Sequence, residues 1–555
     1  MIIEIYPEKA QYLSKEEIKL IVECEQPTVD YYEARLTITH LQNKIHDESY
    51  HLYDSRNEIT IPGMDTDFGG YGVEIMVYQK EELLGRSYTA FDVVSECSRS
   101  IRYGFLSDFD TVDGSECEDV SNLRKLHINM IQYYDWSYRH DDFVGKETIY
   151  KDMMGRQVDR DTVKIKIAAC KKYGIKSLGY GAVYAASKGF YEEHKESGLY
   201  TSSGEPLVFI DTFYIMNVSN KSNWREHIIG EYAKAVSEVG FDGIHMDTYG
   251  FPKTAYSYHQ QELIQLAEEY PSLIEDTKKR LDELTPENHL IFNNVGNWPV
   301  STVVNTPQDA VYIELWEPYV KYSHIKQIIR EAARERLGNK PIILAAYLAP
   351  FREDTPEKAT NAALLLTAAV TVNGAYNLLV GENNAVLTQG YYVDHSFLQE
   401  AASGKLRSYY DFLVQYMELF YDDKLKDVSM THIGWDNTEY RCLTEPWSVD
   451  GEAEKIWITV RERESRKLIS FINLCGNSSN EWNAGKVQPI LKEDIKMQVQ
   501  VDKEVKGLYF LSPDLDHGKS QELCYERINS DRGWKIQFTV PRLEIWSNIW
   551  VDLEE

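Results

Sequence analysis

Between about residues 100 and 425, short apolar runs alternate with long charged segments, and this alternation restricts the fold more than any other feature of the chain. Such alternation is typical of βα units around a parallel sheet. The runs expected to form strands are Ile101–Phe109, His127–Asp135, Ser177–Tyr184, Leu207–Phe213, Gly243–Asp247, His289–Asn294, Ala310–Glu314, Pro341–Tyr347 and Ala375–Gly381. The expected helices include Trp224–Val239, Tyr258–Leu284, His324–Leu337 and Pro356–Val372.

Eight or nine strands over about 325 residues suit a (β/α)8 barrel with one excursion. A doubly wound open sheet is the alternative. Polar residues of functional type end many different strands, and we therefore favour the barrel.

The flanking regions lack this alternation, and 555 residues are too many for one compact core. Near the N-terminus, β-rich runs such as Ile18–Cys24 and Gly72–Tyr78 predict an immunoglobulin-like β-sandwich over residues 1–98. Strand-like runs return in residues 428–555, as in Lys455–Val460, and predict a C-terminal antiparallel β-sandwich. The predicted fold class is therefore multidomain, α/β plus all-β, with a central (β/α)8 TIM barrel over residues 99–427.

Charge and cysteine usage restrict the partners. The net charge of −29 argues against binding to nucleic acid or to an anionic membrane surface. The seven cysteines show no metal-ligand spacing, so we expect mostly buried free thiols, no metal and no cofactor. The acidic segment Asp110–Asp119 lacks the spacing of a calcium loop and is expected to be solvated. The sequence does not indicate an oligomeric state.

The N-terminus shows no signal peptide, and no apolar run approaches the roughly 18 residues that cross a bilayer. We therefore expect a soluble chain, which is either cytoplasmic or a mature form whose leader was removed.

Two of the expected strands end in a carboxylate, Asp247 in one and Glu314 in the other. Side chains along a strand point alternately to the two faces of the sheet. His245 and Asp247 therefore lie on the same face of the first strand. Tyr312, Glu314 and Trp316 likewise share one face of the second strand. The apolar residues of both strands lie on the other face, which is expected to pack against the surrounding helices. The two carboxylates are therefore expected inside the barrel, at the C-terminal ends of its strands, where barrel enzymes have their active sites.

Two carboxylates on either side of a sugar ring can share the work of cleaving a glycosidic bond. One attacks the anomeric carbon, and the other donates a proton to the leaving oxygen. We predict Asp247 as the nucleophile and Glu314 as the acid/base. The alternative is that each is a structural carboxylate. Asp242 lies at the entry end of its strand and Glu317 has already left its own, so both are weaker candidates.

Further polar and aromatic residues follow the strands. The segment Gln132–His140 combines rings with hydrogen-bonding groups, as a sugar subsite does, although a packed loop plug is the alternative. Polar residues also end other strands, at Asp211, Asn293 and Asn384 among others, and any one of them can be only a helix cap. The predicted substrate-binding residues are Asp108, Tyr134, Asp135, Trp136, His140, His245, Asn294, Trp316, Glu382 and Asn383.

Four segments resemble glycoside hydrolase family 66, the dextranases and cycloisomaltooligosaccharide glucanotransferases. They are Tyr134–His140, Phe241–Gly250, Ile313–Trp316 and Gly381–Asn384, in this order. The order of the predicted domains fits as well. The resemblance implies a secreted retaining enzyme that acts on the α-1,6 linkages of dextran or isomaltooligosaccharides, with Asp247 matching the nucleophile and Glu314 the acid/base.

The resemblance also bears on the type of product. Members that make cyclic products carry a large carbohydrate-binding insertion late in the barrel, whereas Tyr347–Ala375 has room only for a loop and one helix. This favours the hydrolytic, dextranase-like branch. The alternatives are a cycloisomaltooligosaccharide glucanotransferase or other transglycosylase, and an inactive α-glucan-binding protein.

Overall fold

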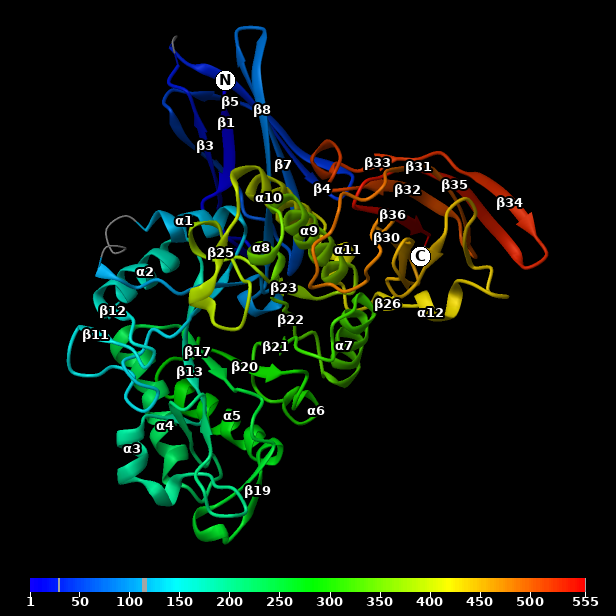
Figure 1. The fold of residues 1–555 in the computed structure, drawn as a ribbon. Coiled ribbons are helices and arrows are strands. Elements are labelled where there is room, and N and C mark those ends of the chain that lie inside the picture. The colour runs from blue at the N-terminus through cyan, green and yellow to red at the C-terminus, as the bar shows by residue number, and fades with distance from the viewer. Residues whose placement is uncertain (28–29, 112–116, 555) are drawn as a thin grey trace.

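The structure is a computed structural model that describes residues 1–27, 30–111 and 117–554 (Figure 1). Part of the acidic segment Asp110–Asp119 lies outside these residues. No helix in the described ranges is long and apolar enough to cross a membrane.

Eight parallel strands form the central sheet. In spatial order they are β9 (Tyr103–Leu106), β10 (Met130–Tyr133), β13 (Lys176–Ala182), β17 (Gly243–Asp247), β20 (His289–Val295), β21 (Ala310–Glu314), β22 (Ile342–Ala345) and β23 (Tyr376–Leu378). A parallel bridge between Phe105 and Gly381 joins the last strand to the first. The sheet is therefore a closed barrel, as predicted, and not an open doubly wound sheet.

Helices follow the barrel strands in turn. They are α1 (Glu118–Lys125), α2 (Arg160–Lys172), α4 (Asn223–Lys234), α5 (Leu266–Asp282), α6 (Val300–Val303), α7 (Tyr322–Glu335), α9 (Pro356–Val372) and α10 (Glu400–Gln415). Helix α9 has the bounds expected from the sequence, because Thr355 caps its first turn and Pro356 occupies the first helical position.

Two expected elements differ from the structure. The run Leu207–Phe213 is not a barrel strand, because Ile210 and Asp211 form a turn at positive φ between β15 (Val208–Phe209) and β16 (Phe213–Ile215). These strands and β14 (Ala185–Ala186) make a small antiparallel sheet, which is the predicted excursion. Helix α5 begins later than expected because β19 (Leu263–Gln265) pairs with β18 (Thr254–Tyr256).

The strand alternation predicted for the barrel is confirmed. Ile244 and Ile313 lie in the core that the barrel wall shares with its helices. His245 and Tyr312 point inward instead, and their ring centroids lie 4.9 Å apart. Asp247 and Glu314 lie on the same strand faces as His245 and Tyr312, so their side chains also point into the barrel.

Two β-domains flank the barrel. In the N-terminal domain, the sheet β1 (Ile3–Pro7), β3 (Ile18–Cys24) and β6 (Arg56–Ile61) shares one core with a second sheet. The second sheet contains β2 (Tyr12–Leu13), β8 (Glu82–Val94), β7 (Phe68–Gln79), β4 (Tyr32–His40) and β5 (Asn43–Leu52).

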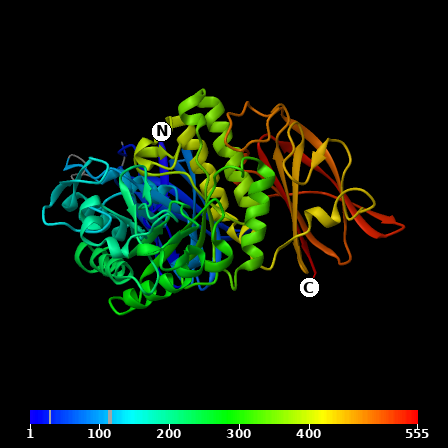
Figure 2. The ribbon, with the colours of Figure 1, turned by 60° about the horizontal axis from the view of Figure 1, so that its bottom comes forward.

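The C-terminal domain also has two sheets around one core. One contains β26 (Lys426–Asp427), β28 (Trp447–Ser448), β29 (Ile456–Arg463), β30 (Arg466–Asn473), β36 (Trp546–Leu553), β32 (Val505–Leu511) and β33 (Gln521–Glu522). The other contains β27 (Tyr440–Cys442), β31 (Lys492–Gln500), β35 (Gly533–Leu543) and β34 (Glu526–Ser530). Figure 2 shows these sheets, in orange and red, to one side of the barrel.

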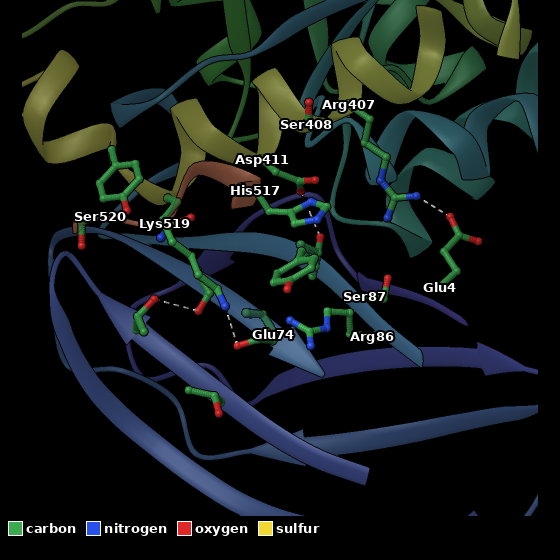
Figure 3. A pocket seen from close by; sticks show the side chains of 18 of the residues that line it. Glu4, Glu74, Arg86, Ser87, Arg407, Ser408, Asp411, His517, Lys519 and Ser520 are labelled. Carbon is green, nitrogen blue, oxygen red and sulfur yellow. Dashed lines mark hydrogen bonds and ion pairs between the residues drawn. The ribbon is translucent and has the colours of Figure 1, made fainter. Parts of the chain in front are cut away.

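Helix α10 is the element around which the three domains meet. It packs against β7 and β8 of the N-terminal domain and against the turn Asp516–Gly518 of the C-terminal domain. A cavity of about 440 Å³ lies at this junction (Figure 3). Lys519 Nζ donates to Glu74 Oε2 at 2.8 Å, and the rings of His517 and Tyr88 stack with centroids 3.8 Å apart. The two terminal domains therefore contact each other directly.

A buried ion pair joins the N-terminal domain to the barrel. Arg102, just before β9, donates two hydrogen bonds to Asp92 in β8, at 3.0 and 2.8 Å. Their side chains are 2% and 0% exposed. Gln11 Nε2 also donates to Asp92 at 2.9 Å, and Arg102 Nε donates to the carbonyl of His127. The charges are thus satisfied on both sides of the domain boundary.

Asp92→Ala leaves the buried guanidinium of Arg102 without its counter-ion and is expected to cost about 3–5 kcal/mol of stability. The measurement is the midpoint of thermal unfolding. Asp47→Ala is the matched control, because Asp47 pairs with Arg35 on the surface of the same domain, where Arg35 is 51% exposed. Equal midpoints for the two variants would contradict this account of the domain junction.

Candidate active site

A pocket of about 430 Å³ opens at the C-terminal ends of the barrel strands. Seven of the predicted site residues line it: Tyr134, Asp135, His140, His245, Asp247, Glu314 and Trp316. They come from β10, β17, β21 and the loops that follow these strands. The barrel therefore brings together residues that are as many as 182 positions apart, from 134 to 316.

Asp247 is the last residue of β17, and its carboxylate accepts two short hydrogen bonds. Tyr180 Oη donates to Oδ2 at 2.6 Å, and Asn293 Nδ2 donates to Oδ1 at 2.6 Å. Burial, followed by the nearby charge of Glu314, raises the pKa of Asp247 to about 7. The bonds from Tyr180 and Asn293 act in the opposite direction, because they stabilise the ionised form.

Glu314 is the last residue of β21, and its side chain is buried. Tyr347 Oη donates to Oε1 at 2.5 Å, and Asn293 Nδ2 donates to Oε2 at 3.0 Å. Burial raises the pKa of Glu314, and the bonds from Tyr347 and Asn293 partly oppose this effect. Both carboxyl groups therefore retain a proton more readily than an exposed carboxyl does.

One amide nitrogen joins the two carboxylates. Because Asn293 Nδ2 lies 2.6 Å from Asp247 Oδ1 and 3.0 Å from Glu314 Oε2, these two oxygens are at most about 5.6 Å apart, the two bonds laid end to end. The two amide hydrogens of Asn293 thus set both the separation and the orientation of the pair.

Aromatic rings form the walls of the pocket. Tyr134 stacks on Tyr392 with centroids 4.4 Å apart, and Phe209 stacks on Tyr249 at 4.5 Å. Trp316 is 45% exposed at the mouth of the pocket. Flat rings with polar groups between them provide apolar faces and hydrogen bonds together, which a sugar ring requires.

Two histidines in the pocket have defined partners. His245 exchanges a hydrogen bond with Tyr103 Oη at 2.9 Å, and burial lowers its pKa to about 3, so it is neutral. His140 Nε2 lies 3.3 Å from Asp135 Oδ1.

Two buried acceptors in the pocket lack a hydrogen-bond partner among the described residues: Gln132 Oε1 and Asn293 Oδ1. A buried polar atom without a partner costs about 1–3 kcal/mol. A ligand hydroxyl placed against either atom would recover that energy.

Five predicted substrate-binding residues lie outside the pocket. Asn294 is 0% exposed and donates to the carbonyls of Phe292 and Tyr312, because it occupies the outer phase of β20. Trp136 is buried and donates to the carbonyl of Tyr180.

The other three lie where the barrel closes. Glu382 is buried; it accepts bonds from the backbone amides of Ser107 and Asp108 and pairs with Lys166 at 2.9 Å. It therefore fastens the end of β23 to the end of β9. The side chains of Asp108 and Asn383 are exposed at this seam and do not line the pocket.

Three residues of the site are not among the predicted binding residues: Asn293, which the sequence places only among the polar strand ends, and Tyr180 and Tyr347. The alternation of side chains along β20 is the signal that finds Asn293, because Asn293 and Ile291 lie on the same, inward face of this strand. Tyr347 lies two residues beyond Ala345, which also faces the barrel interior. The weaker carboxylates take no part in the pocket: Asp242 accepts a bond from the Ser177 amide, and Glu317 is exposed. In the described part of the chain, no three His, Cys, Asp or Glu side chains are grouped to hold a metal ion.

Comparison with known proteins identifies the family. The model of Glycosyl hydrolase family 66 matches residues 7–550. The chain is 23% identical to a cycloisomaltooligosaccharide glucanotransferase of Niallia circulans, over 99% of this chain and 71% of the relative. A dextranase of Streptococcus salivarius is 22% identical over 88% of this chain and 68% of the relative.

A solved structure has the same fold. It is a Paenibacillus sp. cycloisomaltooligosaccharide glucanotransferase complexed with cycloisomaltoheptaose, with a TM-score of 0.88 and 20% identity. The match covers 99% of this chain and 100% of that one. Since the family model spans nearly the whole sequence, the protein belongs to glycosyl hydrolase family 66.

Proposed function

We propose that the protein is a retaining enzyme that cleaves α-1,6-glucosidic linkages by double displacement and transfers the released glucosyl chain to an acceptor sugar. The observation that carries the mechanism is the limit of about 5.6 Å between Asp247 Oδ1 and Glu314 Oε2. Retaining glycosidases hold their carboxyl groups about 5–5.5 Å apart, and inverting enzymes need about 6.5–9.5 Å to admit a water.

In the first step, Asp247 attacks the anomeric carbon while Glu314 donates its proton to the leaving oxygen. Burial raises the pKa of both carboxyl groups, and the hydrogen bonds to Asp247 and to Glu314 act in the opposite direction on each. The proposed step has Asp247 ionised and Glu314 protonated. In the second step, Glu314 removes a proton from the acceptor hydroxyl, whose oxygen then displaces Asp247 from the glycosyl ester. The two displacements together retain the anomeric configuration.

The substrate class follows from the names of the relatives, because dextran and isomaltooligosaccharides are α-1,6-linked glucans. Transfer is favoured over hydrolysis because two glucanotransferases align with 99% of the chain, whereas the dextranase aligns with 88%. The short segment Tyr347–Ala375 is the observation that favours hydrolysis, because the alignments with the two glucanotransferases run over 705 and 710 positions, whereas this chain has 555 residues and therefore lacks segments that those relatives carry. Hydrolysis is the second candidate, because a dextranase is among the relatives. Both carboxylates are present, and this opposes an inactive binding protein.

Replacing either carboxylate tests the roles. Glu314→Gln is expected to lower kcat for dextran cleavage about 10²–10⁴-fold, because it removes the general acid. Asp247→Asn is expected to lose more, because no covalent intermediate forms, and both variants should still bind dextran. Asp242→Asn and Glu317→Gln are the controls and should keep nearly normal rates. An active Asp247→Asn enzyme would rule out the mechanism.

The dependence of kcat/KM on pH tests the proton donor. Tyr347→Phe removes a hydrogen bond that stabilises ionised Glu314, so the pKa of Glu314 rises further and the alkaline limb of the profile moves to higher pH. Tyr392→Phe is the control, because its hydroxyl bonds to Tyr312 at 2.9 Å and to Tyr347 at 3.5 Å. An alkaline limb that stays in place in Tyr347→Phe would mean that Glu314 is not the proton donor.

Product masses separate transfer from hydrolysis. The enzyme is incubated with dextran, pullulan and starch, and the products are sized over time. We expect cyclic or rearranged isomaltooligosaccharides from dextran, and a cycle is lighter by one water than its linear equivalent. Linear products alone from the earliest times would leave hydrolysis as the function, and intact dextran would contradict both candidates.

A further inference from the structure

A cysteine, a histidine and an aspartate lie in line at the barrel rim opposite the pocket. Cys97 belongs to the short turn Cys97–Arg99 that links β8 to β9. His289 is the first residue of β20, and Asp309 comes just before β21. Cys97 Sγ lies 3.5 Å from His289 Nε2, and His289 Nδ1 lies 3.2 Å from Asp309 Oδ1.

We propose that Cys97 is a reactive thiolate, activated by His289 and Asp309, and that it is a site of modification by hydroperoxides and other soft electrophiles. A histidine oriented by a carboxylate toward a sulfur is the arrangement that activates a nucleophilic cysteine. This site is separate from the glucan site: Asn293 lies four residues further along β20 than His289, or about 13 Å at 3.3 Å per residue.

Asp309 holds the imidazole in the orientation that the proposal needs. Its Oδ2 accepts the backbone amide of Leu290 at 2.7 Å, which leaves Oδ1 to accept from His289 Nδ1. Burial alone would lower the pKa of His289. The hydrogen bonds to Asp309 and Cys97 have the larger, opposite effect, so the pKa of His289 is raised to about 10. With Nδ1 directed at Asp309, the imidazole Nε2 faces the sulfur and can take its proton, and the resulting imidazolium stabilises the thiolate.

Charged groups of both signs lie at this rim. Glu96 directly precedes Cys97, and the backbone amide of His289 donates to the carbonyl of Asp242. Lys340 lies near Asp309, and Arg336 interacts with both Arg99 and Asp423. Burial lowers the pKa of Lys340 to about 8.

Other cysteines have a different environment. Burial raises the pKa of five of them, so they resist ionisation: Cys24, Cys117, Cys170, Cys442 and Cys475. Cys524 is exposed. It therefore serves as an internal standard for an accessible thiol in the same molecule.

The proposed oxidation balances with the hydroperoxide as the only co-reactant. The Cys97 sulfur attacks the terminal oxygen of the hydroperoxide, an S–O bond forms and the O–O bond breaks. The sulfur loses two electrons and becomes a sulfenic acid, while the hydroperoxide is reduced to an alkoxide or hydroxide. That anion takes a proton from the His289 imidazolium or from water.

The test is competitive labelling of the full-length enzyme with limiting iodoacetamide, followed by peptide mass spectrometry. At neutral pH, Cys97 is expected to react about tenfold faster than Cys524, because an ordinary thiol with a pKa near 8.5 is only a few per cent ionised. The labelling rate of Cys97 should also stay nearly flat from neutral to mildly alkaline pH, whereas that of Cys524 rises. Hydrogen peroxide followed by dimedone should tag Cys97 first.

Two variants separate activation from folding. His289→Gln and Asp309→Asn are each expected to reduce labelling of Cys97 to the rate of Cys524 or below, while glucan cleavage is retained as evidence of a folded barrel. If a variant fails to fold, the dependence of the Cys97 labelling rate on pH in the unaltered enzyme still tests whether Cys97 is activated. A Cys97 rate that rises with pH in parallel with Cys524, or that stays below it, would overturn the proposal.

Discussion

The hydrogen bonds from one carboxamide, that of Asn293, determine what the pocket can do. Its nitrogen donates to Asp247 and to Glu314, so one oxygen of each carboxyl group lies within about 5.6 Å of the other, although the two groups would otherwise repel each other. At that separation a pair favours the state with one proton and one charge, because two buried negative charges are costly. This state is also the one that double displacement requires.

The barrel supplies the rigidity on which this contact depends. Asp247, Asn293 and Glu314 end or nearly end three neighbouring strands, so the hydrogen-bonded register of the sheet fixes the spacing of their backbones. Glu382 and Lys166 fasten the seam between the last strand and the first. At the opposite rim, the pair of Arg102 and Asp92 ties the barrel to the N-terminal domain. The catalytic proposal therefore places the chemistry on strands and the aromatic walls mainly on loops.

Much of this arrangement could be predicted from sequence, and the failures have physical causes. Apolar alternation located all eight barrel strands and put Asp247 and Glu314 on the inner face. The same alternation distinguishes Asn293, which shares the inner face of β20 with Ile291, from the predicted Asn294, which faces outward and bonds to backbone carbonyls. Glu382 and Trp136 have the residue types of a sugar site, yet burial against backbone groups gives them structural contacts that only the closed barrel creates. Tyr180 and Tyr347 were missed because a tyrosine at a strand end looks like core until its hydroxyl partner is known.

The most direct measurement is the capture of the covalent intermediate. Glu314→Gln enzyme is mixed with α-glucosyl fluoride, whose leaving group needs no proton, then denatured, digested and analysed by peptide mass spectrometry. The slow second step should let the intermediate accumulate, and the peptide that contains Asp247 should be heavier by one anhydroglucose residue. An unmodified Asp247 peptide together with a fluoride burst, or an adduct on another residue, would contradict the assignment of Asp247 as the nucleophile.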